Sequence, residues 1–193
     1  MRSARRSHLP HVVITALLVL ALTWTPWGGA IASSDRPPRS PEYVIKAAYL
    51  YNFAMFVEWP TDAFATAASP LVICVVGADP FGWALERTVE GKRINKRRIV
   101  IERVQSIQDA RQCHIVFVGV DGDTRMSEFS TRLSSQSVLL VGESDNVLTQ
   151  GATINFTVRD NKVRYDINLD AAKRARLTVS SKLLNLARVV HRS

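Results

Sequence analysis

The stretch Leu71–Val76, LVICVV, is a continuous apolar run rich in β-branched residues. Such a run has no polar face, and it is typical of a strand buried on both sides in a parallel sheet. Similar runs follow at residues 99–104 (IVIERV), 113–120 (CHIVFVGV) and 138–141 (VLLV). Helical segments are expected between the runs, over residues 81–89, 106–111 and 124–133. Strands that alternate with helices indicate an α/β domain.

Beyond these strands, residues 152–158 and Lys162–Asn168 alternate apolar and polar side chains, and Arg159-Asp160-Asn161 between them predicts a hairpin. Three further helices are expected, over residues 41–57, 170–176 and 180–191. The predicted fold class is therefore α/β, with a mixed six-stranded sheet and flanking helices. Its N-terminal part is parallel-type, and its C-terminal part is a β-hairpin.

The N-terminal segment has the features of a secretory signal peptide. Three arginines occupy its first six positions, and an apolar run of twelve residues begins at Val12. That run is short for a membrane span, which needs about 20 residues. Ala30-Ile31-Ala32 matches the pattern before a cleavage site.

We therefore expect a cleaved signal peptide over residues 1–32, a flexible lead-in over 33–40 and one domain over 41–193. An uncleaved membrane anchor is the alternative. Cleavage predicts a mature protein that is secreted across the inner membrane into the periplasm.

The charge of the chain is only mildly basic once the N-terminal segment is set aside. The whole chain has 25 Lys and Arg against 17 Asp and Glu, and three of those arginines lie in the first 32 residues. The remainder therefore holds 22 basic and 17 acidic residues, a net charge of +5. This excess is mild for a soluble domain, and the densest basic run, residues 92–98, contains no aromatic residue to stack on a base, so we expect no nucleic-acid partner.

Two cysteines, Cys74 and Cys113, lie in apolar segments 39 residues apart. Two buried free thiols are one interpretation, since cysteine is common in protein cores. Export favours a disulfide, because paired cysteines usually bridge in an oxidising compartment. We therefore expect a Cys74–Cys113 disulfide, formed between neighbouring strands.

No catalytic or metal-binding constellation is evident, so we expect a protein that is not an enzyme and needs no cofactor. His114 lies inside an apolar segment, where a structural role is more common than general-base catalysis. No CxxC or HxxxH spacing suggests a metal site. Asp166 and Asp170 are expected to end a strand and cap a helix, respectively.

The densest basic run is KRINKRR, residues 92–98. Two interpretations remain open for it. It is a solvated connection leading into a strand, or it contacts an anion or a lipid headgroup.

Several segments carry a resemblance to a known family. Residues 45–60 (IKAAYLYNFAMFVEWP) form the most specific one. The others are residues 71–77, 113–119, 151–156, 163–168 and 180–184. In these segments the chain resembles the YfiR/HmsC-like family, over about residues 41–190.

The resemblance implies an exported α/β protein that represses an inner-membrane diguanylate cyclase by binding its periplasmic sensory domain. Cyclic di-GMP and biofilm formation would then fall. It also implies that an outer-membrane lipoprotein draws the repressor away, and that Cys74 and Cys113 form the bridge of the family. Whether the chain forms a homodimer is left open.

The chain departs from the family in two places. It lacks the second cysteine pair of some relatives, and Ala175-Arg176-Leu177 stands where relatives commonly have Ala-Gly-Leu. A glycine there would suit a left-handed helix end.

We expect the partner contact to involve residues where the hairpin meets a short helix. The candidates are Asn168, Asp170, Arg174 and Arg176. Polar residues at element ends are reasonable recognition points, and arginine is favoured in interfaces. A solvated helix face is the alternative. At the level of function, the alternative to a repressor is a periplasmic module that binds a small ligand.

Overall fold

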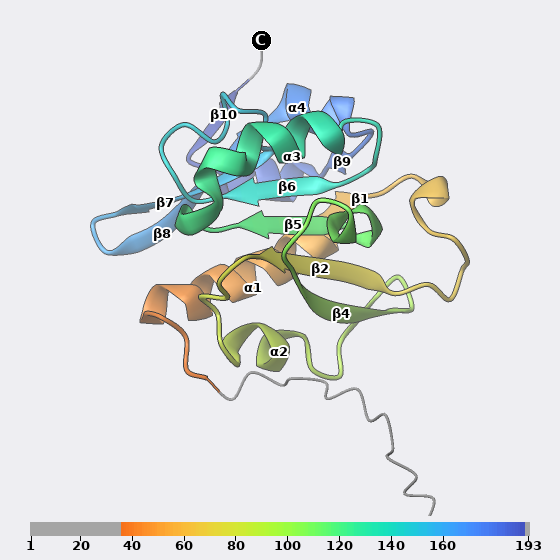
Figure 1. Cartoon of the computed structure of the whole chain (residues 1–193), viewed down its shortest axis with the longest axis horizontal. Helices are drawn as coiled ribbons and strands as arrows, with labels where there is room; N and C mark the ends of the chain where they lie inside the picture. Colours follow the sequence, from red (N-terminus) through yellow and green to blue (C-terminus); the bar gives the residue numbers. More distant parts are fainter. Residues whose placement is uncertain (1–35, 192–193) are drawn as a thin grey trace, which may run out of the picture. The chain divides into compact units, whose positions relative to one another are not determined.

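The structure is a computed structural model that describes residues 36–191. It contains an eight-stranded mixed sheet with the strand order β10-β8-β7-β6-β5-β2-β4-β3 (Figure 1). The strands are β2 (Leu71–Val76), β3 (Arg93–Ile94), β4 (Arg97–Val104), β5 (Ile115–Val118), β6 (Leu139–Gly142), β7 (Ile154–Arg159), β8 (Lys162–Asn168) and β10 (Val189–His191). A separate small sheet pairs β1 (Val57–Glu58) with β9 (Thr178–Val179).

The predicted fold class is confirmed. Strands β2, β4, β5, β6 and β7 run parallel, and β8 returns antiparallel to β7 as the predicted hairpin. All six expected strands are present. Two short strands extend the sheet, with β3 antiparallel to β4 at one edge and β10 parallel to β8 at the other.

Helices cover both faces of the sheet, as Figure 1 shows for α3 in front of it and α1 behind it. The α-helices are α1 (Pro41–Phe56), α2 (Ala84–Val89), α3 (Met126–Arg132), α4 (Leu169–Arg174) and α5 (Ser181–Leu186). Alternate residues of β2 point to opposite faces, so that Ile73 packs in the core beneath α1 and Cys74 in the core beneath α3. Burial on both faces explains why LVICVV contains no polar residue.

The expected helix over residues 180–191 is wrong in its second half. Helix α5 ends at Leu186, and Val189–His191 forms strand β10. Two adjacent valines favour an extended chain. The Arg188 backbone N–H also donates to the Tyr165 carbonyl, and its guanidinium binds the buried Asp166, which fixes this segment beside β8.

Other element ends shift by a few residues. Cys113 and His114 precede β5 rather than belonging to it. The helical segment expected at 124–133 begins as a 3₁₀ helix, η3 (Val120–Arg125), before α3. Residues 92–98 are not a plain connection, because they form most of the β3–β4 hairpin.

The chain enters the domain along the loop before α2. The Trp83 backbone N–H donates to the Arg36 carbonyl, and the Arg39 N–H donates to the Pro80 carbonyl. Gly82 lies at this crossing with a positive φ of 55°, and a Cβ there would come within 2.0 Å of the Arg36 carbonyl oxygen, so only glycine fits. The expected signal peptide lies outside the described residues. Among residues 36–191, no helix is long and apolar enough to cross a membrane.

Candidate functional site

The residues expected to contact a partner lie on and around α4. Asn168 precedes this helix, and its Oδ1 accepts hydrogen bonds from the backbone N–H groups of Asp170 (3.1 Å) and Ala171 (3.0 Å). These bonds satisfy N–H groups that the first helical turn leaves unpaired. Asn168 is therefore the capping residue, and the expectation that Asp170 caps the helix is wrong. The Asp170 carboxylate lies 3.5 Å from the ammonium group of Lys173.

Arg176 follows α4 in a left-handed conformation, with a φ of 57°. This conformation explains why a glycine would suit the position, since a side chain disfavours it. The guanidinium is held by two contacts, to Asp62 Oδ2 (2.7 Å) and to Ser137 Oγ (3.2 Å). Arg176 thus links the end of α4 to the segment after α1 and to the loop before β6.

The four candidate residues separate into two pairs along α4. Asn168 and Asp170 lie at its start, where the Asn168 side chain is used for capping. Arg174 and Arg176 lie at its end with exposed side chains. Arg176 also lines a polar cavity of about 250 Å³ with Asp62 and Arg111. The exposed guanidinium groups of the candidate set therefore lie at the end of α4.

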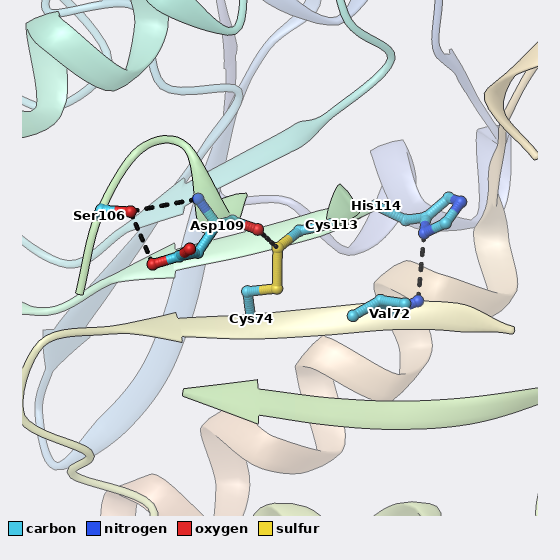
Figure 2. The surroundings of a disulfide bond; sticks show 6 residues. All are labelled: Val72, Cys74, Ser106, Asp109, Cys113 and His114. Atoms are coloured by element: carbon cyan, nitrogen blue, oxygen red, sulfur yellow. Dashed lines mark hydrogen bonds between the residues drawn. A yellow bond between two sulfur atoms is a disulfide. The ribbon is translucent and has the colours of Figure 1, made fainter. Parts of the chain in front are cut away.

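A disulfide joins Cys74 of β2 to Cys113, with the two Cα atoms 5.9 Å apart (Figure 2). It joins β2 to the residue two positions before the neighbouring strand β5, within the core beneath α3. A nearby turn is closed by Ser106, whose hydroxyl accepts from the Asp109 N–H (3.2 Å) and donates to the Asp109 carboxylate (2.6 Å). The bridge thus fixes the loop that leads into β5.

His114, next to the bridge, is a buried neutral imidazole. Its Nδ1 accepts a hydrogen bond from the Val72 backbone N–H (3.1 Å), as Figure 2 shows. Its Nε2 lies 3.2 Å from the Ala63 carbonyl oxygen, which requires the proton to be on Nε2. Its ring stacks on Phe64 with the centroids 4.3 Å apart, and the Arg97 guanidinium lies 3.7 Å from the Phe64 ring centroid. Both nitrogens have structural partners, which agrees with the expected structural role.

Burial lowers the pKa of His114 from 6.5 to about 4, and the positive charge of Arg97 adds to this lowering. The unfolded chain then takes up a proton at a higher pH than the folded one. The stabilisation from neutral His114 is therefore complete above pH 6.5 and is lost as the pH falls through 4.

We expect the free energy of unfolding to fall by about 3 kcal/mol from this group between pH 7 and pH 4. Urea unfolding at both pH values, on the native protein and on His114→Gln, measures it. The variant lacks the titrating ring, so it should lose less stability on acidification, by about that difference. Equal losses in the two proteins would show that His114 is not the group responsible.

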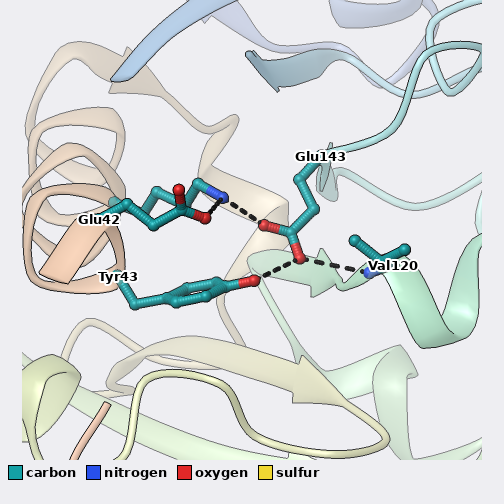
Figure 3. Close-up of polar contacts among 5 residues, drawn as sticks. Glu42, Tyr43, Val120 and Glu143 are labelled. Carbon is teal, nitrogen blue, oxygen red and sulfur yellow. Dashed lines mark hydrogen bonds and ion pairs between the residues drawn. The ribbon is translucent and has the colours of Figure 1, made fainter. Parts of the chain in front are cut away.

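A second buried polar cluster was missed from the sequence. It centres on Glu143, which directly follows β6 (Figure 3). Its Oε1 accepts from the Tyr43 hydroxyl (3.0 Å) and from the Val120 backbone N–H (3.2 Å). Its Oε2 accepts from the Lys46 ammonium (2.6 Å), which also binds Glu42 (2.9 Å).

Both charges of the central pair are removed from water, since the side chains of Lys46 and Glu143 are 4% and 2% exposed. Burial, followed by the nearby Glu143 charge, raises the pKa of Tyr43, so its hydroxyl remains a donor. Two features of the sequence could have indicated the cluster. Lys46 is a charged residue in a nearly apolar helix, and Glu143 follows the apolar end of a parallel strand.

Glu143 also lines a cavity of about 150 Å³ at the carboxyl ends of β2 and β5. Other lining residues include Arg39, Gly77, Gly119 and Arg125. From β2 the chain continues to β4 on one side, and from β5 it continues to β6 on the other. Such a reversal is where open α/β sheets commonly bind ligands.

The described residues contain no group of three or more His, Cys, Asp or Glu side chains that could hold a metal ion. Trp59 and Phe64, two aromatic residues near the end of α1, are partly buried against the core.

Two solved structures share a low similarity with this chain. One is a conserved domain protein from Vibrio cholerae, with 10% identity, a TM-score of 0.46, and coverage of 62% of this chain and 54% of that one. The other is an ABC domain in complex with L-Trp from Streptococcus pneumonia, with 9% identity, a TM-score of 0.48, and coverage of 75% and 60%. The chain thus spans little more than half the length of these proteins, and the scores are too low to bear on its function.

The model of the YfiR/HmsC-like family matches residues 43–188. This range contains all the described strands except β10, which begins at Val189. The chain belongs to the YfiR/HmsC-like family. Proteins of this family are periplasmic regulators of the cyclic di-GMP pathway, and they act through a signalling partner rather than by catalysis.

Proposed function

We propose that this protein represses an inner-membrane diguanylate cyclase by binding the periplasmic sensory domain of that enzyme. The family match over residues 43–188 is the observation that carries the proposal. Export past a signal peptide over residues 1–32 would place the protein on the same side of the membrane as that sensory domain. Cyclic di-GMP and biofilm formation fall when the repressor is bound, and an outer-membrane lipoprotein that captures the repressor reverses the effect.

Repression of this kind is a population shift. The protein binds the inactive form of the sensory domain more tightly than the active form, and so raises the fraction of inactive enzyme. Moving an equilibrium from 99% active to 1% active requires about 5.5 kcal/mol of differential affinity. An interface of ordinary size, about 800 Å² per partner, supplies this only if it contains well-packed anchor residues.

The contact surface that we favour is the end of α4. Arg174 and Arg176 expose their guanidinium groups there, and arginine is enriched among residues that dominate binding energy. Asn168 and Asp170 lie at the other end of the same short helix, and we place them at the border of this surface.

Charge reversal at the arginine end should weaken capture of the cyclase sensory domain. We expect Arg174→Glu to reduce retention in a periplasmic cross-linking pull-down by about tenfold or more, the effect of losing an arginine that dominates an interface. The melting temperature should hardly change, because Arg174 has no ion pair with a described residue and surface substitutions are usually mild.

Arg176→Glu needs a matched control, because it also breaks the contacts with Asp62 and Ser137. Arg176→Gly breaks them as well but relieves the left-handed backbone. If Arg176→Glu and Arg176→Gly weaken capture equally, removal of the Arg176 side chain explains the weaker binding, and the added negative charge contributes nothing further. Full capture by all three variants would place the contact elsewhere.

A small-ligand sensory module is the second candidate, and the cavity beside Glu143 favours it. The cavity lies at the reversal of the sheet topology and has arginines on its border. Native mass spectrometry of the protein purified from the periplasm distinguishes the two functions. A stoichiometric small molecule, with no captured cyclase, would favour the ligand-binding module.

A further inference from the structure

The basic run of residues 92–98 folds into a tight hairpin at one edge of the sheet. Strand β3 (Arg93–Ile94) pairs antiparallel with the start of β4, and only Asn95 and Lys96 lie in the turn. Both turn residues have a positive φ, 49° for Asn95 and 67° for Lys96. A two-residue turn with this backbone matches the twist of the strands and normally takes Asn-Gly.

Cations occupy two kinds of position in this hairpin at which they lower its stability. Lys96 occupies the position that favours glycine, and a residue with a Cβ is disfavoured there. Arg93 lies directly opposite Arg98 on the paired strands, and like charges in this position repel each other. Both choices lower the stability of the hairpin, and residues that break local rules mark sites kept for function.

The cations of the run divide into those used within the fold and those directed to solvent. Arg97 binds the Thr66 carbonyl (2.9 Å) and the Ser69 carbonyl (2.7 Å), and Lys92 lies over the Tyr51 ring. Arg93, Lys96 and Arg98 are exposed, and none of them forms an ion pair with a described carboxylate. Within the hairpin, the Arg93 guanidinium donates a solvent-exposed hydrogen bond to the Lys96 carbonyl (3.1 Å).

Another cation at this edge of the sheet is placed differently. Arg103, also on β4, binds both Asp79 and Glu86. Carboxylates therefore balance the charge of Arg103, whereas no described carboxylate pairs with the three cations of the hairpin. We name Arg93, Lys96 and Arg98 the basic tip.

We propose that the basic tip contacts an anionic phospholipid surface and holds the protein at a periplasmic membrane face. The charges are carried by long, flexible side chains around a turn, and residues 92–98 include no aromatic side chain that could stack on a nucleic-acid base. Diffuse positive charge of this kind suits mobile headgroups, where each Lys or Arg near the surface strengthens binding by about fivefold, or about 1 kcal/mol. This inference concerns a membrane and goes beyond the repression of a cyclase.

Three cations give weak and reversible attachment. Their combined effect is about a hundredfold in the binding constant. Attachment of this strength would keep the protein close to the membrane while it still exchanges between partners. It also depends on salt, since exposed charges are screened within about 3 Å at 1 M ionic strength.

Vesicle co-sedimentation tests the proposal on the protein purified from the periplasm. The probes are phosphatidylcholine vesicles with and without phosphatidylglycerol, at low salt and at about 1 M salt. We expect binding only to the phosphatidylglycerol vesicles at low salt. The triple variant Arg93→Thr/Lys96→Gly/Arg98→Thr should bind about a hundredfold more weakly.

The same variant provides a control for folding, because the basic tip opposes stability. Lys96→Gly creates the favoured Asn-Gly turn, and Arg98→Thr removes the repulsion with Arg93. Arg93→Thr also removes the exposed hydrogen bond to the Lys96 carbonyl, which the two stabilising changes should at least offset. The melting temperature of the variant should therefore be no lower than that of the native protein, so a loss of binding cannot come from unfolding.

A matched hairpin controls for net charge. The β7–β8 hairpin also has a two-residue turn with positive φ, and it exposes Arg159, Lys162 and Arg164. Its turn carries Asp160, and it lies at the opposite end of the parallel strands (Figure 1). Replacing its three cations by Thr should weaken vesicle binding much less than the triple variant of the basic tip.

Three results would overturn the proposal. They are equal binding with and without phosphatidylglycerol, equal losses from the two hairpins, and no vesicle binding by the native protein. If the basic-tip variant loses capture of an acidic protein while the native protein ignores vesicles, the tip serves a protein partner and the membrane assignment is wrong. Loss of cyclase capture by Arg174→Glu with vesicle binding intact would separate this inference from the proposed repression.

Discussion

Replacing Lys46 by Met should lower the free energy of unfolding by about 3–5 kcal/mol, the usual cost of breaking a buried ion pair. The Lys46 ammonium lies 2.6 Å from Glu143 Oε2 in a position almost closed to water. Methionine keeps much of the aliphatic volume, so the change removes the charge without opening a large cavity. Glu143 then remains buried with its negative charge held only by Tyr43 and the Val120 N–H.

The partner substitution should cost less. Glu143→Gln keeps an acceptor for Tyr43, and Lys46 keeps its second carboxylate, Glu42, which is one-third exposed. In the double variant no buried charge is left unpaired, so we expect it to be more stable than Lys46→Met alone.

Urea unfolding of the two single variants and the double variant gives the coupling energy. A stability of Lys46→Met within about 1 kcal/mol of the native protein would mean that water reaches Glu143 in solution. In that case the cluster would be a hydrated surface group and not a buried pair.

Loss of the disulfide should cost about 4 kcal/mol, because the bridge closes a loop of this size in the unfolded chain. Cys74 and Cys113 are 39 residues apart, and both are buried. Alanine is the better replacement, since a serine hydroxyl in this core would lack a partner. A loss of this size is a large part of the 5–15 kcal/mol that stabilises a typical domain, so the variant should be marginally stable near 37 °C.

Chemical unfolding of Cys74→Ala/Cys113→Ala, with and without reductant, measures the effect. The native protein in reductant should approach the stability of the variant, and reductant should leave the variant unchanged. Intact mass without reductant should be lower by two hydrogens than the mass of the reduced chain. Two reactive thiols in the native secreted protein would contradict the bridge.

The elements predicted best from the sequence are those whose pattern has a single structural meaning. Leu71–Val76 and Lys162–Asn168 match β2 and β8 residue for residue. The first is apolar throughout because it is buried on both faces, and the second alternates because the hairpin presents two different faces. Residues 180–191 satisfy both a helical spacing and a β-branched strand, so their pattern alone could not separate α5 from β10.

Other features depend on contacts between residues far apart in the chain. Tyr43 and Glu143 are separated by 100 positions, and only the folded sheet brings them together. Strand β3 has two residues and is recognisable only by its partner on β4. Arg176 departed visibly from the family pattern, yet its contacts with Asp62 and Ser137 required the structure. Local chemistry was therefore predictable, and long-range polar pairing was not.

The contact surface on α4 stays a prediction. The structural roles of its residues decide which of them should be substituted to test it. Asn168 is committed to capping, so its substitution would cost stability and confuse a binding measurement. Arg174 is the cleaner probe. The proposed repression and the proposed membrane contact use surfaces with no residue in common, so single variants can separate them.

The central claim, repression of a diguanylate cyclase from the periplasm, is tested most directly by cellular cyclic di-GMP in a deletion strain. The strain is complemented with the chain carrying residues 1–32, with the chain lacking them, or with an empty vector, while the membrane cyclase is expressed. We predict that deletion raises cyclic di-GMP and that only the chain with its N-terminal segment restores the low level. Unchanged cyclic di-GMP on deletion, or full restoration by the chain that cannot be exported, would contradict the account.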